Sequence, residues 1–120
     1  MKLITFAVPS YNSEAYMRNC IDSILKGGED VEIIIVDDGS KDGTGKIADE
    51  YEAAYPTICR AVHQETGGHG EGVNQGIRHA TGLYYKVVDS DDWVDETALR
   101  TVLDTVKKHL AENTLPDMYV

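Results

Sequence analysis

The sequence predicts an α/β fold, in which helices cover both faces of a mainly parallel sheet in a three-layer, Rossmann-like arrangement. Short apolar segments rich in β-branched residues alternate along the chain with longer segments of helical periodicity. Two of the apolar segments, 31–36 and 83–88, end directly in the acidic runs Asp37-Asp38 and Asp89-Ser90-Asp91-Asp92. Because open α/β sheets bind ligands beyond the carboxyl ends of their strands, these two ends are expected to form a site for a metal and a phosphate-bearing ligand.

The first half of the chain contains two strand–helix pairs. Residues 2–8 are predicted as a strand, and Asn12 or Ser13 is expected to cap a helix that runs to about Lys26. Its apolar face is predicted to hold Tyr16, Cys20, Ile24 and Leu25, and Gly27-Gly28 ends it. A second strand is predicted over 31–36, followed by a turn-rich loop (39–45) and a helix over 46–55 that stops at Pro56.

The second half repeats the alternation. We predict a strand over 58–63, a glycine-rich loop over 67–72, a short helix over 73–80 and a strand over 83–88. Asp95 is expected to cap a helix that runs to about Glu112, with an apolar face formed by Leu99, Val102, Leu103, Val106 and Leu110. Residues 117–120 resemble the start of another strand, so the chain is expected to be a piece of a longer protein.

Length, charge and cysteine content limit the classes of function that the chain can have. The 120 residues suffice for one domain, and the net charge of −10 argues against a nucleic-acid partner, which needs Lys and Arg on phosphates. The charge fits an anionic ligand bound through a divalent cation, although a solvated acidic surface is the simpler alternative. Cys20 and Cys59 lack metal-site spacing and are expected to be buried thiols. No targeting or membrane-spanning segment is evident, which favours the cytoplasm, with any membrane association supplied by missing parts.

The motif Asp89-Ser90-Asp91 is the stronger chemical signal. In an extended chain, residues two apart point to the same side, so Asp89 and Asp91 can face one ligand while Ser90 faces away. Mg²⁺ and Mn²⁺ take such carboxylate oxygens together with phosphate and water. A helix-capping acidic turn, with Asp92 or Asp95 as the cap, remains open, and Asp37-Asp38-Gly39-Ser40 has the alternative of an ordinary acidic β-turn.

The glycine-rich loop Gly67 to Gly72 can bring backbone N–H groups close to a phosphate or a sugar. It is not a dinucleotide fingerprint, because Gln75 stands where the third glycine is required. The alternative is a flexible connector, in which His69 is a plain loop histidine.

The combination of motifs is more specific than each part. Val8-Pro9-Ser10-Tyr11-Asn12, Glu14, the run from Val36 to Thr44, Asn74-Gln75-Gly76-Ile77, the run from Ala80 to Tyr84, and Asp89-Ser90-Asp91-Asp92 occur in this order. This pattern strongly resembles the nucleotide-binding half of family 2 glycosyltransferases, which have the GT-A fold of nucleotide-diphospho-sugar transferases. The resemblance covers essentially the whole chain, so residues 1–120 are expected to be the nucleotide-sugar-binding part of such a domain, truncated at its C-terminal end.

The resemblance implies site residues at matching positions. Tyr11 would pack on the base beside Pro9, Asp38 would hydrogen-bond the base, and Asp89 would lie near the ribose. Asp91, together with Asp89, would hold Mn²⁺ or Mg²⁺ at the diphosphate. The donor contacts implied in full are Pro9, Tyr11, Glu14, Asp38, Asn74, Asp89 and Ser90. Two departures from the family stand out: Val73, where arginine is frequent, and the unusual stretch Gly68-His69-Gly70-Glu71.

The implied activity is transfer of a sugar from a nucleoside-diphosphate donor to a hydroxyl of a carbohydrate or lipid-linked acceptor, with inversion, as in cell-envelope polysaccharide biosynthesis. The family's catalytic base and acceptor site lie beyond Val120, so this segment is expected to contain no catalytic residue, to be inactive alone and to self-associate through its open edge. One alternative is a nucleotidyltransferase, although Pro9-Ser10-Tyr11-Asn12 replaces the glycine-rich basic loop expected there. The other is a non-catalytic nucleotide-sugar-binding module.

Overall fold

The computed structural model describes residues 2–65, 74, 76 and 78–111. Three sequence predictions fall outside these residues: the glycine-rich loop 67–72 with His69 and Glu71, the departure at Val73, and the strand expected from 117 onward.

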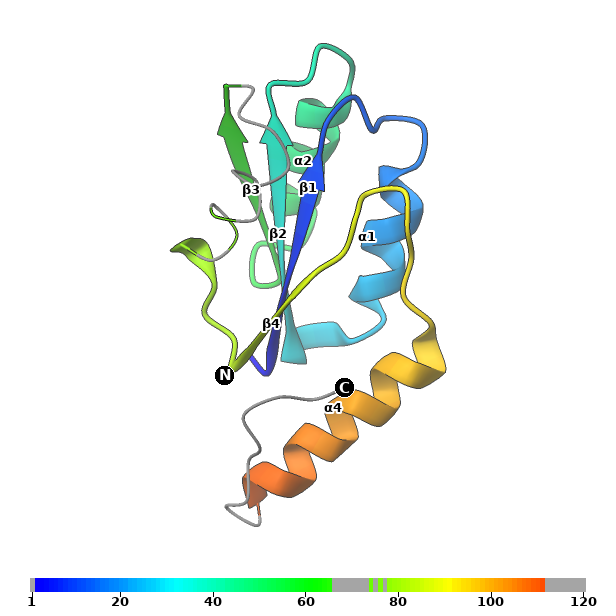
Figure 1. Cartoon of the computed structure of the whole chain (residues 1–120), viewed down its shortest axis with the longest axis vertical. Helices are drawn as coiled ribbons and strands as arrows, with labels where there is room; N and C mark the ends of the chain where they lie inside the picture. The colour runs from blue at the N-terminus through cyan, green and yellow to red at the C-terminus, as the bar shows by residue number, and fades with distance from the viewer. Residues whose placement is uncertain (1, 66–73, 75, 77, 112–120) are drawn as a thin grey trace.

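Four parallel strands form one sheet in the order β3-β2-β1-β4. They are β1 (Ile4–Ser10), β2 (Val31–Asp38), β3 (Cys59–Gln64) and β4 (Tyr84–Val87). In register, Ile4 pairs with Val31 and with Tyr84, and Ile33 pairs with Cys59. All seven residues of β1 are buried, as expected for a central parallel strand covered on both faces. The carboxyl ends of β1, β2 and β3 therefore meet at one end of the molecule, the top of Figure 1.

Three helices, α1 (Met17–Leu25), α2 (Thr44–Ala54) and α4 (Glu96–Ala111), pack on one face of this sheet. Short crossovers return the chain from β1 to β2 and from β2 to β3, with the 3-10 turn η1 (Gly28–Asp30) before β2. Figure 1 shows α4 running below α1 on that side. One apolar core joins the layers, with Phe6, Val8, Ile33 and Ile35 from the strands and Met17, Ile21, Ile24, Leu99, Leu103 and Val106 from the helices.

The opposite face carries the third layer. Asn74, Gly76, Arg78 and His79 are helical, and Gly76 is buried. A side-chain methyl on Gly76 would clash with Ala7 of β1 and Tyr85 of β4, so the helical backbone lies directly on the sheet. The predicted three-layer α/β fold is thereby confirmed.

The start of α1 differs from the prediction. The helix begins at Met17, and its N-cap, Tyr16, makes no side-chain capping bond. Neither Asn12 nor Ser13 serves as the cap: Asn12 adopts a positive φ of 47°, and the Ser13 hydroxyl bonds Tyr11 and Ser90 rather than an N–H of the first turn of α1. The placement of Tyr16 on the apolar face is also wrong: it is 43% exposed, and Met17 and Ile21 are buried instead.

Other local predictions hold. Asp95 accepts a hydrogen bond from the N–H of Ala98 at 2.8 Å, which is the expected cap of α4. Helix α2 begins at Thr44, two residues early, because the Asp42 carboxylate accepts both the backbone N–H and the hydroxyl of Thr44. Cys20 and Cys59 are buried free thiols, and burial raises the pKa of each to about 12. Among the described helices, none combines the length and the apolar character that crossing a bilayer requires.

Candidate functional site

The order of the strands in the sheet indicates where a ligand would bind. The chain moves from β1 to β2 to β3 in one direction and then returns to the other side of β1 with β4. Ligands of open α/β sheets bind at such a reversal, in the crevice beyond the carboxyl ends. Pairing of β1 with β4 ends at Ala7 and Val87, whereas pairing with β2 continues to Ser10. Pro9, which has no N–H to donate, occupies the stretch where β4 pairing has ended.

The acidic turn after β4 brings three carboxylates together. Oxygen atoms of Asp89, Asp91 and Asp92 lie within 4.8 Å of one another, and all three residues are exposed. The turn is closed by a hydrogen bond of 2.9 Å from the N–H of Asp92 to the carbonyl of Asp89. Ser90 is only 7% exposed and so faces inward as predicted, although it does so within a turn rather than an extended strand. Asp92, which the sequence suggested only as a helix cap, joins the predicted pair in this cluster.

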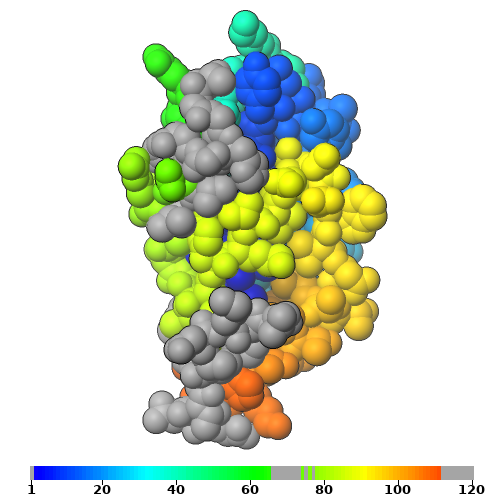
Figure 2. Space-filling model, viewed as in Figure 1, coloured from blue at the N-terminus to red at the C-terminus, as the bar shows by residue number. Residues whose placement is uncertain are grey.

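This turn lies beside α1. The pKa of Cys20 in α1 is raised to about 12 mainly by burial, and the charges of Asp92, Asp89 and Asp91 add to the effect. The N–H of Val94 donates to the hydroxyl of Ser23 in α1 at 2.9 Å. Figure 2 shows the segment after β4 (yellow) against the segment after β1 (blue) on the same surface.

The segment after β1 contains an exposed aromatic ring and a bonded acid. Tyr11 is 48% exposed. Glu14 is attached to the loop after β2, because its N–H donates to Asp42 at 3.2 Å and its carboxylate accepts the N–H of Gly43 at 3.3 Å. Hydrogen bonds therefore join the loop after β1 to the loop after β2, and the Glu14 carboxylate has Gly43 as its hydrogen-bond partner.

The two acids that end β2 point to opposite faces of the sheet. Asp38 is 6% exposed and accepts a hydrogen bond of 2.8 Å from Nε2 of Gln64 on β3. Asp37 accepts the N–H of Ser40 at 3.0 Å, so Asp37 takes the turn role that the sequence left open. Only Asp38 lies on the face that also carries the helical residues Asn74 and Gly76. Asn74 itself is exposed.

His63 is a residue that the sequence did not single out. Its Nδ1 lies 3.0 Å from Asp37, and its Nε2 lies 2.7 Å from Asp49 of α2. Hydrogen bonds to Asp37 and then to Asp49 raise the pKa of His63, because both favour the charged imidazolium. Little in the sequence around His63 indicates these contacts, because Asp49 reaches His63 only where α2 packs against β3.

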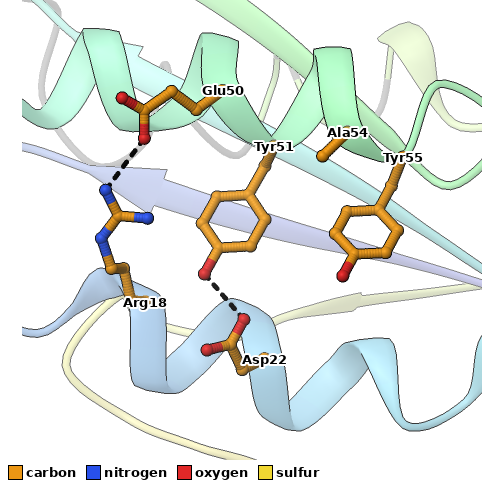
Figure 3. A pocket seen from close by; sticks show the side chains of 6 residues that line it. All are labelled: Arg18, Asp22, Glu50, Tyr51, Ala54 and Tyr55. Carbon is orange, nitrogen blue, oxygen red and sulfur yellow. Dashed lines mark hydrogen bonds and ion pairs between the residues drawn. The ribbon is translucent and has the colours of Figure 1, made fainter.

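A groove of about 310 Å³ lies between α1 and α2, lined by Arg18, Asp22, Glu50, Tyr51, Ala54 and Tyr55. Figure 3 shows four of its polar side chains bonded in pairs, with Arg18 2.9 Å from Glu50 and the hydroxyl of Tyr51 2.7 Å from Asp22. None of the predicted site residues lines it. These contacts join two helices on the outer side of one sheet face, so we assign the groove to helix packing.

Comparison with known proteins identifies relatives of the chain. The family described as "Glycosyl transferase family 2" matches residues 5–120. The chain is 38% identical over 120 residues to glycosyltransferase GlyG of Streptococcus pneumoniae serotype 4, an alignment that covers 98% of this chain and 40% of the relative. The chain thus spans two fifths of that relative's length.

Two solved structures have the same fold. S. aureus TarS 1–349 in complex with UDP superposes with a TM-score of 0.77 at 30% identity, covering 92% of this chain and 33% of TarS. The mannosyltransferase PcManGT from Pyrobaculum calidifontis, in complex with GDP-Man and Mn²⁺, gives a TM-score of 0.71 at 26% identity, covering 83% of this chain and 31% of the other. The fold around the acidic strand ends is therefore shared with proteins that bind nucleotides, one of them together with a metal.

Proposed function

The chain belongs to glycosyl transferase family 2, and from this premise we propose that residues 1–120 form the donor-binding part of a metal-dependent, inverting glycosyltransferase. The observation that carries the proposal is the convergence of Tyr11, Asp38 and the acidic turn 89–92 at the carboxyl ends of β1, β2 and β4. The donor would be a nucleoside-diphosphate sugar, as the ligands of the two solved relatives suggest.

The residues of the acidic turn fit a divalent cation. Three carboxylates within 4.8 Å repel one another unless a positive charge lies between them. Their hard oxygen atoms suit Mn²⁺ or Mg²⁺, which complete their shells with phosphate and water. We propose Asp91 and Asp89 as the ligands, with Asp92 as a third candidate. When bound, the cation supplies neutralisation of the charge that develops on the departing diphosphate.

We propose two kinds of contact with the donor. Pro9, Tyr11, Asp38, Asn74 and Asp89 would touch the nucleotide directly, with the exposed Tyr11 ring packing on the base and Asp38 accepting an N–H from it. Glu14 and Ser90 would act indirectly, because the Glu14 carboxylate accepts the N–H of Gly43 and the Ser90 hydroxyl is bonded to the hydroxyl of Ser13.

The reaction proposed for the whole enzyme is a single displacement. The acceptor oxygen forms a bond to the anomeric carbon while the bond to the diphosphate breaks, and the electron pair leaves with the diphosphate. A general base takes the acceptor proton. That base and the acceptor site would lie in another part of a longer protein. The cytoplasmic location, the acceptor class and self-association stay predictions.

The chain offers a direct assay of the metal site, because Trp93 is its one tryptophan, is 68% exposed and follows Asp92. Titration with MnCl₂ in the presence of UDP or GDP should quench Trp93 fluorescence saturably. Asp91→Asn should weaken Mn²⁺ binding by about tenfold or more, the scale on which metal sites respond to altered coordination. Asp104→Asn, an exposed carboxylate on α4, is the matched control. Asp91 is not a ligand if Asp91→Asn binds Mn²⁺ as the parent does.

Thermal shift separates the remaining alternatives. A donor-binding domain should gain melting temperature with a nucleoside diphosphate only when Mn²⁺ or Mg²⁺ is present, since a ligand of the native state stabilises it. Greater stabilisation by a nucleoside triphosphate with a sugar phosphate would favour a nucleotidyltransferase. A non-catalytic module would bind the donor, and the longer protein would transfer no sugar.

A further inference from the structure

A hydrogen bond between two buried hydroxyl groups connects the acidic turn 89–92 to the rest of the proposed site. The Oγ atoms of Ser13 and Ser90 lie 2.7 Å apart, although the two residues are 77 positions apart in the sequence. Ser13 is 1% exposed and Ser90 is 7% exposed, so solvent does not compete for this bond. The bond links the segment after β1 directly to the turn that carries the three carboxylates.

Ser13 is in turn fastened to the loop after β2. Its N–H donates to Oγ1 of Thr44 at 2.7 Å, and that hydroxyl donates to Asp42 at 2.6 Å. The hydroxyl of Ser13 also lies 3.2 Å from both the N–H and the carbonyl of Tyr11. Ser13 therefore connects the segments after β1, β2 and β4, three of the segments that the proposed donor would touch.

The inward direction of Ser90 decides where its neighbours point. In the turn closed by the Asp92 N–H and the Asp89 carbonyl, the Ser90 hydroxyl is buried while Asp89, Asp91 and Asp92 are exposed, so anchoring Ser90 inside keeps the three carboxylates at the surface. Three anionic groups confined within 4.8 Å tend to separate, and separation requires the turn to rotate or unfold. The bond to Ser13 opposes that movement at the centre of the cluster, while Ser23 holds the far end of the turn at Val94.

We infer that Ser13 is a positioning residue for the metal cluster, acting through Ser90 to hold Asp89 and Asp91 together before the cation binds. The inference rests on the proposed function of the acidic turn. The bond between Ser13 and Ser90 also couples the segment that carries Tyr11 to the turn that carries Asp91, so a displacement of either is transmitted to the other through Ser13.

The test uses the 120-residue chain, MnCl₂ with UDP, and Trp93 fluorescence. Ser90→Ala removes the cross-loop bond alone and should weaken Mn²⁺ binding by about tenfold, the lower end for groups that orient metal ligands. Ser13→Ala should weaken it at least as much. The double variant should bind Mn²⁺ about as weakly as the weaker single variant, well short of the product of the two losses, because both changes remove one shared bond. Thr101→Ala, which loses a hydroxyl bonded within α4, is the control and should keep the parent affinity.

Melting temperatures measured in parallel without ligand separate positioning from plain stabilisation. If Ser90→Ala and Ser13→Ala lower the melting temperature but leave the Mn²⁺ dissociation constant unchanged, the inference is overturned. The inference is also overturned if the losses of Mn²⁺ affinity caused by Ser90→Ala and Ser13→Ala multiply in the double variant, as they would at independent sites. Failure of the parent to bind Mn²⁺ would instead reject the proposed metal site. Parent binding that Asp91→Asn abolishes and Ser90→Ala leaves intact rejects the positioning role alone.

Discussion

Gln64 donates from Nε2 to Oδ1 of Asp38 over 2.8 Å, across the register pair that ends β3 and β2. An ionised carboxylate only accepts hydrogen bonds, so this contact fixes which end of the amide faces Asp38. Oε1 of Gln64 is then left buried without a partner among the described residues. A buried, unpaired carbonyl is costly, and the hydrogen bond from Nε2 to Asp38 offsets part of that cost.

We predict that Gln64 orients the Asp38 carboxylate so that it can accept a hydrogen bond from the nucleotide base of the donor. Asp38→Ala should cost about 1–3 kcal/mol of nucleotide binding, the range for a charged hydrogen-bond partner. Gln64→Leu should give a smaller loss of the same kind. Calorimetry with UDP and Mn²⁺ measures both, and Glu65→Gln, an exposed neighbour on the same strand end, is the control. An unchanged dissociation constant for Asp38→Ala would reduce the end of β2 to a structural turn.

The stability of the domain should depend on pH through His63. Hydrogen bonds to Asp37 and Asp49 raise its folded pKa above the ordinary value of 6.5. A raised folded pKa means that the folded state holds the proton more tightly than the unfolded state. The stabilisation is therefore complete below about pH 6.5 and is lost as the pH rises through the folded pKa.

His63→Asn should accordingly lower the melting temperature more at pH 5.5 than at pH 8.5. His79→Asn, on the opposite sheet face, is the control for general effects of histidine charge. A difference between parent and His63→Asn that stays constant across this pH range would contradict the imidazolium bridge.

Gly76→Ala should destabilise the protein, opposite to the usual effect in a helix. At an exposed helical site, this change gains about 1 kcal/mol of stability. Here the added methyl would clash with Ala7 and Tyr85, and overpacking of this kind costs about 1–3 kcal/mol. Urea unfolding measures the net sign. The double variant Gly76→Ala with Ala7→Gly should recover part of the loss, and failure to recover any of it would place the strain elsewhere.

Asp95→Ala should lower the free energy of unfolding by about 1 kcal/mol, because it removes the side-chain acceptor for the N–H of Ala98 at the start of α4. Asp95→Asn keeps an acceptor oxygen and should retain most of the stability. Equal destabilisation by both variants, measured by urea unfolding, would show that the negative charge rather than the cap is what matters.

The sequence by itself determined the elements whose signals are local. Runs such as Ile33 to Val36 are short, β-branched and apolar on both sides, which favours a central strand, and Asp95 caps a helix through a neighbour three residues away. Acidic residues directly after two such strands were enough to predict a candidate site at this edge of the sheet, because parallel strands bring their carboxyl ends together there. Buried thiols at Cys20 and Cys59 followed in the same way from their places in apolar segments.

Only the tertiary structure decided which of these residues work together. The partner of Ser90 is Ser13, 77 positions away, and no local pattern distinguishes that hydroxyl from a helix cap. The cap predicted at Ser13 was wrong because α1 begins only at Met17, and the Ser13 hydroxyl bonds Tyr11 and Ser90 in the loops before and across from the helix. His63 with Asp49, and Gly76 with Ala7, likewise meet only once helices pack on the sheet. Periodicity fixes which face of an element is apolar, whereas long-range contacts depend on how the faces are stacked.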